Sequence, residues 1–188
     1  SIVPFIFFRL LLPIMRIVSG IVKGRRILPP QIEDVRPTKD RVREAVFNSL
    51  RSFDLIDGRH FFDLFAGSGA LGLEALSRGA KFATFVDRRK ACIEVIQKNI
   101  ETLGFIDVTD VRHCDYLQVA TTITKNDIVL LDPPYNFADW DYLLRHLSAE
   151  VAVIETESEI SLPESWTSIK FKKYGSTYVN IAVQADKR

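Results

Sequence analysis

The chain has 188 residues, of which 47% are hydrophobic and 26% are charged. This length and composition predict one globular domain with a sizeable core, and they exclude low-complexity and disordered classes. The formal net charge of +1 hides an asymmetry: residues 1–50 hold nine Lys and Arg against four Asp and Glu, whereas residues 51–188 hold sixteen against twenty.

The first fourteen residues, SIVPFIFFRLLLPI, are apolar but are interrupted by Pro4, Arg9 and Pro13. The stretch is shorter than the roughly 20 residues that cross a bilayer, so we expect no membrane association. Met15, the only methionine, begins a run typical of a soluble protein. We therefore expect residues 1–14 to be an extension outside the native fold.

Residues 16–28 alternate short β-prone runs with glycines, which indicates a small hairpin. Next, Thr38 is a candidate N-cap for a helix with one apolar face, consisting of Val42, Ala45, Val46, Leu50 and Phe53. We place Lys39, Arg41 and Arg43 on the opposite face. This basic segment, residues 15–56, indicates a docking surface for a polyanion, although a solvated helix face would explain the same charges.

From Gly58 onward, apolar strands alternate with helices, which predicts a Rossmann-like domain over residues 57–188. Later strands are expected at 107–112, 127–131 and 150–155, with a helix over 139–147. The closing runs WTSIKFKK and TYVNIAV, joined by a tight turn, predict an antiparallel edge. The fold class is therefore α/β, with a parallel sheet covered by helices on both faces.

The run DLFAGSGALG follows the first of these strands and contains Gly67, Gly69 and Gly72 in the spacing GxGxxG. Such a turn lets the backbone approach a nucleoside cofactor. By itself it fits a nicotinamide oxidoreductase, another nucleoside-cofactor enzyme or a plain turn. Asp87 ends the next strand, where it is placed to accept the hydroxyls of a ribose. Asp115 is a candidate for an adenine contact or, equally, a helix cap.

The run IVLLDPPYNF, residues 128–137, decides between these alternatives. Asp132 offers a carboxylate acceptor, Pro133 offers a carbonyl whose direction the proline pair restricts, and Tyr135 offers a ring. Two acceptors and a ring suit a planar exocyclic amine that is to be alkylated. A proline-rich turn with a capping aspartate is the structural alternative. Cys92, Cys114 and the three separated histidines lack metal-binding spacings, so we expect no metal and a reducing, cytoplasmic setting.

At these motifs the chain resembles the bacterial small-subunit (16S) ribosomal RNA guanine-N2 methyltransferases of the RsmD type. The resemblance extends from Met15 and includes MRIVSGIVKGRRI, RPTKDRVREAVFNSL, DLFAGSGALGLEALSRGA, LDPPY and KYGSTYVNIAV. It implies a class I methyltransferase fold and S-adenosylmethionine as methyl donor. Three positions depart from the family pattern: Asp87 stands where Glu is common, Cys114 where Gly is common, and ETE follows the fifth strand where Glu-His is frequent.

The resemblance also implies roles for individual residues. The methionine and ribose part of the donor would be surrounded by Asp63, Ala66, Gly67, Ser68 and Gly69, the ribose would contact Asp87, and the adenine Asp115. The catalytic clasp would consist of Asp132, Pro133, Pro134 and Tyr135, with Tyr135 or Phe137 stacking on the target base. Arg36 and Thr38 would lie near the donor or the substrate.

The sequence therefore predicts methyl transfer to N2 of a guanine in small-subunit ribosomal RNA, within an assembling small ribosomal subunit. RNA phosphates are expected to contact the basic residues Lys23, Arg25, Arg26, Lys39, Arg41 and Arg43. Methylation of adenine N6 in DNA or RNA is an alternative, because the same clasp suits any planar amine. A NAD-linked oxidoreductase is a more distant one, since it leaves the DPPY run unexplained.

Overall fold

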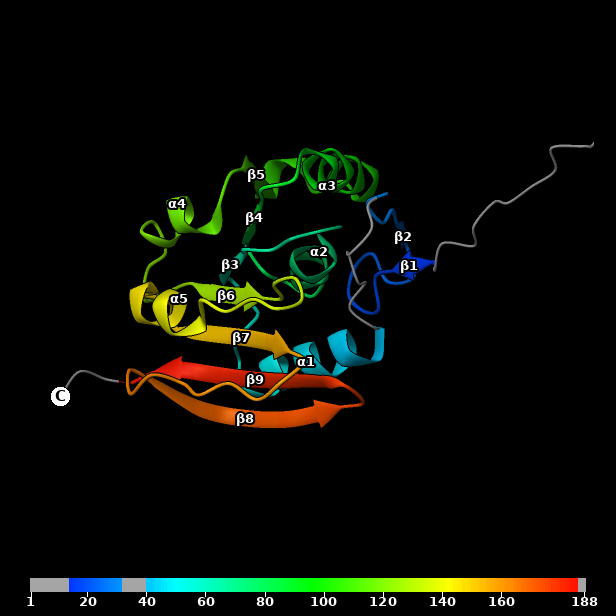
Figure 1. The fold of residues 1–188 in the computed structure, drawn as a ribbon. Coiled ribbons are helices and arrows are strands. Elements are labelled where there is room, and N and C mark those ends of the chain that lie inside the picture. Colours follow the sequence, from blue (N-terminus) through cyan, green and yellow to red (C-terminus); the bar gives the residue numbers. More distant parts are fainter. Residues whose placement is uncertain (1–13, 32–39, 186–188) are drawn as a thin grey trace, which may run out of the picture.

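The structure, a computed structural model, describes residues 14–31 and 40–185. Within these residues, seven strands form one sheet in the order β5-β4-β3-β6-β7-β9-β8 (Figure 1). The strands are β3 (His60–Asp63), β4 (Phe82–Asp87), β5 (Thr109–His113), β6 (Ile128–Leu131), β7 (Val151–Thr156), β8 (Trp166–Tyr174) and β9 (Thr177–Gln184). Strands β3 to β7 pair in parallel, and β9 and β8 are antiparallel to their neighbours. The predicted parallel sheet with an antiparallel edge is confirmed.

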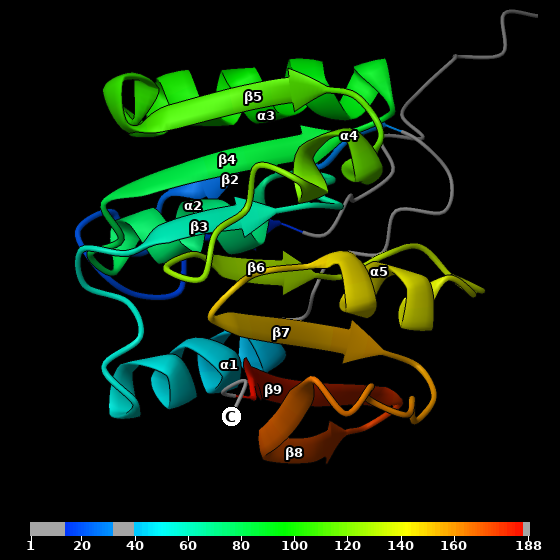
Figure 2. The same ribbon diagram turned by 90° about the vertical axis from the view of Figure 1, so that its left-hand side faces the viewer.

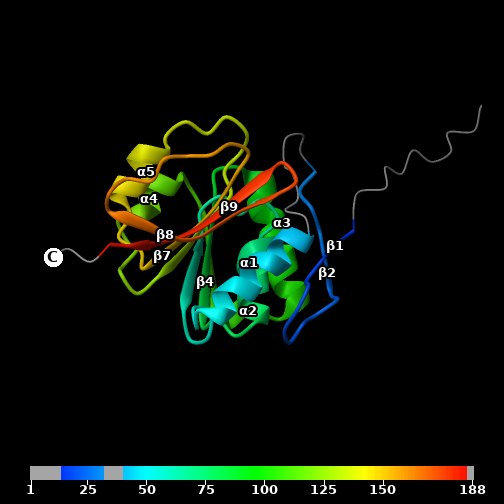
Figure 3. The ribbon, with the colours of Figure 1, turned by 90° about the horizontal axis from the view of Figure 1, so that it is seen from below.

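Helices cover both faces of this sheet, as predicted. They are α1 (Asp40–Ser52), α2 (Ala70–Ser77), α3 (Lys90–Leu103), α4 (Tyr116–Ala120) and α5 (Trp140–His146), with a short 3-10 helix, η1 (Ile106–Val108), before β5. Figure 3 shows α4 and α5 on one side of the sheet and α1, α2 and α3 on the other. In the described part of the chain, no helix is long and apolar enough to cross a membrane.

The centre of the sheet shows why a continuous apolar run becomes a strand here. All four residues of β6 are fully buried. Ile128 and Leu130 pack into the cluster beneath α1, whereas Val129 and Leu131 pack into the cluster beneath α4 and α5. Because both faces are covered, the strand has no polar alternation, and each of these side chains contributes about 1.5–3 kcal/mol by its burial.

A two-stranded ribbon, β1 (Met15–Arg16) with β2 (Arg26–Ile27), packs outside α2. It is held by Glu74 of α2, whose buried carboxylate accepts hydrogen bonds from the backbone N–H groups of Val18 and Ser19 at 2.8 and 3.0 Å. The expected hairpin is therefore present. Of residues 1–14, which we predicted to be a separate extension, only Ile14 belongs to the described residues, and it is exposed.

One assignment on α1 was wrong. Arg43, which we placed on the outer face, is fully buried. Its Nε lies 3.3 Å from Glu74 Oε2, and its Nη2 donates to the carbonyl of Arg16 at 2.5 Å. The position explains this, because residues 43, 46, 47 and 50 recur at helical spacing and so share one face. Arg43 consequently cannot belong to a surface that binds phosphates. Arg41 is exposed, as expected.

Candidate active site

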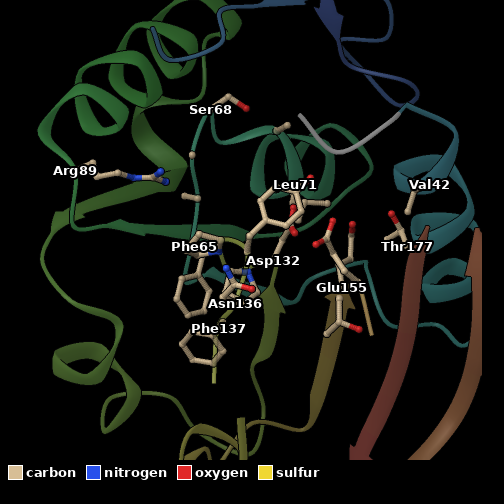
Figure 4. A pocket seen from close by; sticks show the side chains of 18 of the residues that line it. Val42, Phe65, Ser68, Leu71, Arg89, Asp132, Asn136, Phe137, Glu155 and Thr177 are labelled. Carbon is tan, nitrogen blue, oxygen red and sulfur yellow. The ribbon is translucent and has the colours of Figure 1, made fainter. Parts of the chain in front are cut away.

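The carboxyl ends of β3, β4, β6 and β7 lie at one rim of the sheet, and a cavity of about 390 Å³ opens there. Three segments line most of it: the glycine loop with Phe65 to Ser68, the run from Asp132 to Phe137, and residues 155–158 after β7. Figure 4 shows their side chains around the cavity. Two regions that are far apart in sequence, the glycine loop and the DPPY run, are thus brought together.

The geometry of the loop explains why glycine occupies its positions. Gly69 caps α2 with φ of 81°, a left-handed conformation that disfavours other residues. A Cβ on Gly72 would come within 2.4 Å of the ring of Phe85 on β4, so only glycine lets α2 lie this close to the sheet. The Gly72 N–H also donates to Asp63 Oδ2 at 3.1 Å. The spacing GxGxxG therefore allows the backbone of α2 to pack closely against the sheet.

Asp87 ends β4 next to this loop, as predicted. Its carboxylate accepts the backbone N–H groups of Gly67 at 3.0 Å and Arg89 at 2.9 Å. The guanidinium of Arg89 binds it as well, from Nε to Oδ1 and from Nη2 to Oδ2, both at 2.9 Å. Burial opposes ionisation, but the hydrogen bonds from Arg89 and Gly67 outweigh it and lower the pKa of Asp87. Arg89, which also lines the cavity, was not singled out in the sequence.

Asp115 behaves in this structure as the helix cap that we gave as its alternative. It precedes α4, and its Oδ1 accepts the backbone N–H of Leu117 at 3.0 Å. It is absent from the described residues that line the cavity. Its contact with an adenine stays a prediction.

The run after β6 combines an exposed ring with an anchored one. Asp132 and Pro133 are half-buried, whereas Pro134 and Tyr135 are exposed. Phe137, in contrast, packs edge-to-face on Phe65 and Trp140, at centroid distances of 5.3 and 5.0 Å. We therefore regard Phe137 as the residue that fixes the run to the core, and Tyr135 as the better placed of the two to stack on a base.

A cluster of carboxyl groups lies under this rim. Asp63 is buried, and its desolvation together with the charge of Asp132 raises its pKa to about 7, although the hydrogen bond from Gly72 opposes this. Desolvation raises the pKa of Glu155 well above its ordinary value, again with the charge of Asp132. Among the described residues, Asp63 Oδ1 and Glu155 Oε1 have no hydrogen-bond partner. The site is thus rich in carboxyl groups, and two of their oxygens are available to accept further hydrogen bonds.

The basic residues of the ribbon lie elsewhere. Lys23, Arg25 and Arg26 are exposed, but the turn between β1 and β2 contacts the C-terminal ends of α2 and α3. The N–H of Ile21 donates to the carbonyl of Ser77 at 2.8 Å, and the other contact is from the Arg25 side chain to α3. Figure 2 shows this turn at the end of the sheet opposite to the arrowheads. The structure therefore does not bring these cations to the cavity.

Three predicted residues, Arg36, Thr38 and Lys39, lie outside the described part of the chain. Where the chain is described, no group of three or more His, Cys, Asp or Glu could hold a metal ion. Met15 and Val42 line the cavity, which sequence reasoning did not predict. In the sequence, the only feature that marks these two residues is that each lies in a short apolar stretch.

A model of the protein family described as Conserved hypothetical protein 95 matches residues 15–183. The chain belongs to this family, the RsmD type. It is 35% identical over 174 residues to Ribosomal RNA small subunit methyltransferase D of Haemophilus influenzae, covering 86% of this chain and 89% of that protein. It is 34% identical to the putative rRNA methyltransferase YlbH of Bacillus subtilis, covering 89% and 97%.

Solved structures agree with this assignment. The putative methyltransferase yhhF from Escherichia coli superposes with a TM-score of 0.79 at 32% identity, covering 91% of this chain and 98% of that one. An RNA methyltransferase from Salinibacter ruber in complex with S-adenosyl-L-homocysteine shares the fold, with a TM-score of 0.59 at 18% identity, covering 81% of this chain and 96% of that one. The protein is a class I methyltransferase with S-adenosylmethionine as its donor.

The cavity fits this donor. S-adenosylmethionine carries positive charge on its sulfonium and its ammonium groups, and buried charge needs a partner of opposite sign. Asp132 and Glu155 line the cavity with carboxyl groups of the required kind, and Glu155 Oε1 has no hydrogen-bond partner among the described residues. The left-handed Gly67, with φ of 57°, leaves the loop backbone open to a close ligand.

Proposed function

We propose that the protein transfers a methyl group from S-adenosylmethionine to the exocyclic N2 of a guanine in small-subunit (16S) ribosomal RNA, in the cytoplasm. One observation carries the proposal: Asp132, Pro133 and Tyr135 open into the same cavity as the glycine loop. The RNA substrate is supported by the names of the relatives in Haemophilus influenzae and Escherichia coli, Ribosomal RNA small subunit methyltransferase D.

The donor would be held mainly by the rim of β3 and β4. Its methionine and ribose part would lie against Asp63, Ala66, Gly67, Ser68 and Gly69. Three of these, Ala66 to Ser68, line the cavity. Its ribose would bind the carboxylate of Asp87, and its adenine would lie toward Asp115. The donor supplies an activated methyl group, because its sulfonium is a good leaving group.

The acceptor amine would be oriented by the end of β6. The Asp132 carboxylate would accept one of its two protons and the Pro133 carbonyl the other, so that the nitrogen lone pair turns toward the methyl group. Tyr135, 48% exposed, would stack on the base. A guanine in structured RNA has to leave its stack to reach this position.

After attack the nitrogen carries a positive charge, and it loses a proton to Asp132 or to water. The carboxylate of Asp132 would stabilise this charge where it develops, and Asp63 and Glu155, whose pKa values are raised, interact electrostatically with Asp132. Most of the rate enhancement would come from alignment of the two reactants, which replaces an encounter in solution by a fixed geometry.

The test is methylation by purified protein of small-subunit ribosomal RNA, and of small subunits, from cells that lack the gene. Mass spectrometry of the digested nucleosides should find N2-methylguanosine, with little product when Asp132 is replaced by alanine. A preference for subunits over naked RNA would identify an assembling particle as the substrate. Formation of N6-methyladenosine instead would overturn the proposal in favour of an adenine methyltransferase.

A further inference from the structure

The hairpin of β8 and β9 forms the exposed edge of the sheet and reaches the mouth of the cavity. Because β9 is antiparallel to β7, its first residue, Thr177, lies at the same rim as the end of β7. Thr177 lines the cavity together with Glu155 to Ser158. Figure 1 shows the turn of this hairpin on the side of the sheet to which the arrowhead of β7 points. The hairpin is thus continuous with the proposed acceptor site.

The hairpin is basic, although the body of the chain is not. Residues 166–184 contain three lysines, Lys170, Lys172 and Lys173, and no Asp or Glu. Lys172 and Lys173 are exposed, whereas Lys170 donates to Ser49 Oγ of α1 at 2.7 Å. Acidic residues occur in the preceding segment, where Glu159 is one of the groups that interact electrostatically with Lys173. Within residues 157–184, every Lys and Arg therefore lies on the hairpin, next to an acidic segment.

Aromatic rings are interleaved with these lysines. Phe171 is 50% exposed and stacks on Tyr178 of β9, with a centroid distance of 5.9 Å and an interplanar angle of 23°. Lys173 Nζ lies 4.6 Å from the ring centroid of Tyr178 and donates to its hydroxyl at 2.9 Å. Lys172 Nζ lies 5.3 Å from the ring centroid of Tyr174. Side chains of a strand alternate between its faces, so Phe171, Lys173 and Tyr178 share one face of the hairpin, whereas Lys172 and Tyr174 lie on the face toward α1. One cation and two flat rings are thus held side by side before any ligand arrives.

This combination suits single-stranded nucleic acid. Bases stack on exposed rings at about 1–3 kcal/mol each, while the neighbouring cations neutralise phosphates. Lysines also protect an edge strand from pairing with other chains, and β8 has the irregularity between Ser168 and Lys170 that often accompanies such protection. That role alone requires neither the exposed Phe171 nor its stacking partner Tyr178.

We propose that the hairpin surface formed by Phe171, Lys173 and Tyr178, on the face of β8 and β9 away from α1, binds the unpaired RNA strand next to the target nucleotide. The inference rests on the proposed function, since it concerns the substrate of that same site. It assigns strand binding to the edge of the sheet beside the cavity, and not to the ribbon, whose turn carries Lys23 and Arg25 at the opposite end. The flanking strand would lead the flipped base into the cavity past Thr177.

The experiment measures binding of a small-subunit ribosomal RNA transcript at several salt concentrations. Lys173→Ala should weaken binding about threefold at low salt and reduce the log–log salt slope by about 0.7–0.9, the value for one lost phosphate contact. Phe171→Leu should weaken binding about fivefold with an unchanged slope, because it removes stacking and not charge. The matched controls are Lys98→Ala, which removes one exposed lysine from α3, and Lys172→Ala, which removes one from the other face of the hairpin.

Three further measurements make the outcome unambiguous. Each variant should keep its melting temperature and its affinity for S-adenosylhomocysteine, which excludes unfolding. The triple variant Lys23→Ala/Arg25→Ala/Arg26→Ala should change affinity no more than the controls do. If the Lys173 and Phe171 variants bind RNA like wild type, or only aggregate more readily, the inference is wrong. If the wild-type protein methylates no ribosomal RNA, the proposed function itself fails.

Discussion

The guanidinium of Arg89 forms a bidentate ion pair with Asp87, in which Nε donates to one carboxylate oxygen and Nη2 to the other, each at 2.9 Å. The backbone N–H groups of Gly67 and Arg89 take the remaining positions. A carboxylate accepts about four hydrogen bonds, so Asp87 is saturated. Since the backbone donors are fixed by the fold, ribose hydroxyls have to displace the Arg89 side chain.

The first prediction follows from this competition. Arg89→Met keeps the apolar stem but removes both donors, and S-adenosylhomocysteine should then bind about three- to tenfold more tightly. Calorimetry measures this, with Arg88→Ala, an exposed neighbour, as the control. The gain should shrink for the 2′-deoxy analogue of the ligand. Weaker binding by the Arg89 variant would show that the guanidinium contacts the ligand directly.

Asp87 itself should be required for donor binding. Asp87→Ala is expected to weaken the affinity for S-adenosylhomocysteine by about 1–3 kcal/mol, because hydrogen bonds from the ribose to a charged acceptor are lost. The wild-type protein should bind NAD undetectably in the same titration. An affinity of the alanine variant equal to wild type would remove Asp87 from the ribose site.

The clasp should affect turnover and not donor affinity. In Asp132→Ala the acceptor amine loses its orienting carboxylate, so we expect calorimetry to show wild-type donor binding while methyl transfer falls by at least about a hundredfold. Asp139→Ala, on the exposed loop after the clasp, is the control. Near wild-type turnover of the Asp132 variant would refute the proposed orientation of the amine.

Asp63 makes stability depend on pH in an unusual direction. Its pKa is about 7 in the folded protein against 3.8 for the free side chain, so folding favours the protonated form. The contribution of Asp63 to the free energy of unfolding should be greatest below about pH 4 and fall by up to about 4 kcal/mol as the pH rises to 7. Chemical denaturation of Asp63→Asn should show a flatter profile. The control Asp107→Asn, at an exposed site, should parallel wild type.

Much of the fold could be predicted because local pattern and tertiary environment agree. The apolar run of β6, buried on both faces, predicts a central parallel strand, and the run after it predicts the rim where a ligand binds. The helix predicted over 139–147 is found at Trp140–His146. These elements depend on periodicity and on strand direction, which the sequence carries locally.

The features that could not be predicted depend on contacts between residues that are far apart in the sequence. Arg43 was assigned to the surface because it is charged, but a partner 31 residues away, Glu74, stabilises it in the core. Likewise, nothing local shows that the ribbon runs along α2 and carries Lys23 away from the cavity. The buried Glu155 was visible only as a departure from a family pattern, since the lack of a hydrogen-bond partner for its Oε1 among the described residues follows from packing.

Glu74 has a consequence for how the chain divides. Its buried carboxylate binds the ribbon through Val18 and Ser19, α1 through Arg43, and its own helix through Arg78 at 2.7 Å. A fragment starting at residue 57 would leave this charge without three of its four donors, at a cost of about 3–5 kcal/mol. Since α2 begins directly at the glycine loop, we expect the ribbon to support the donor site, and the amino-terminal segment and the catalytic half to unfold together.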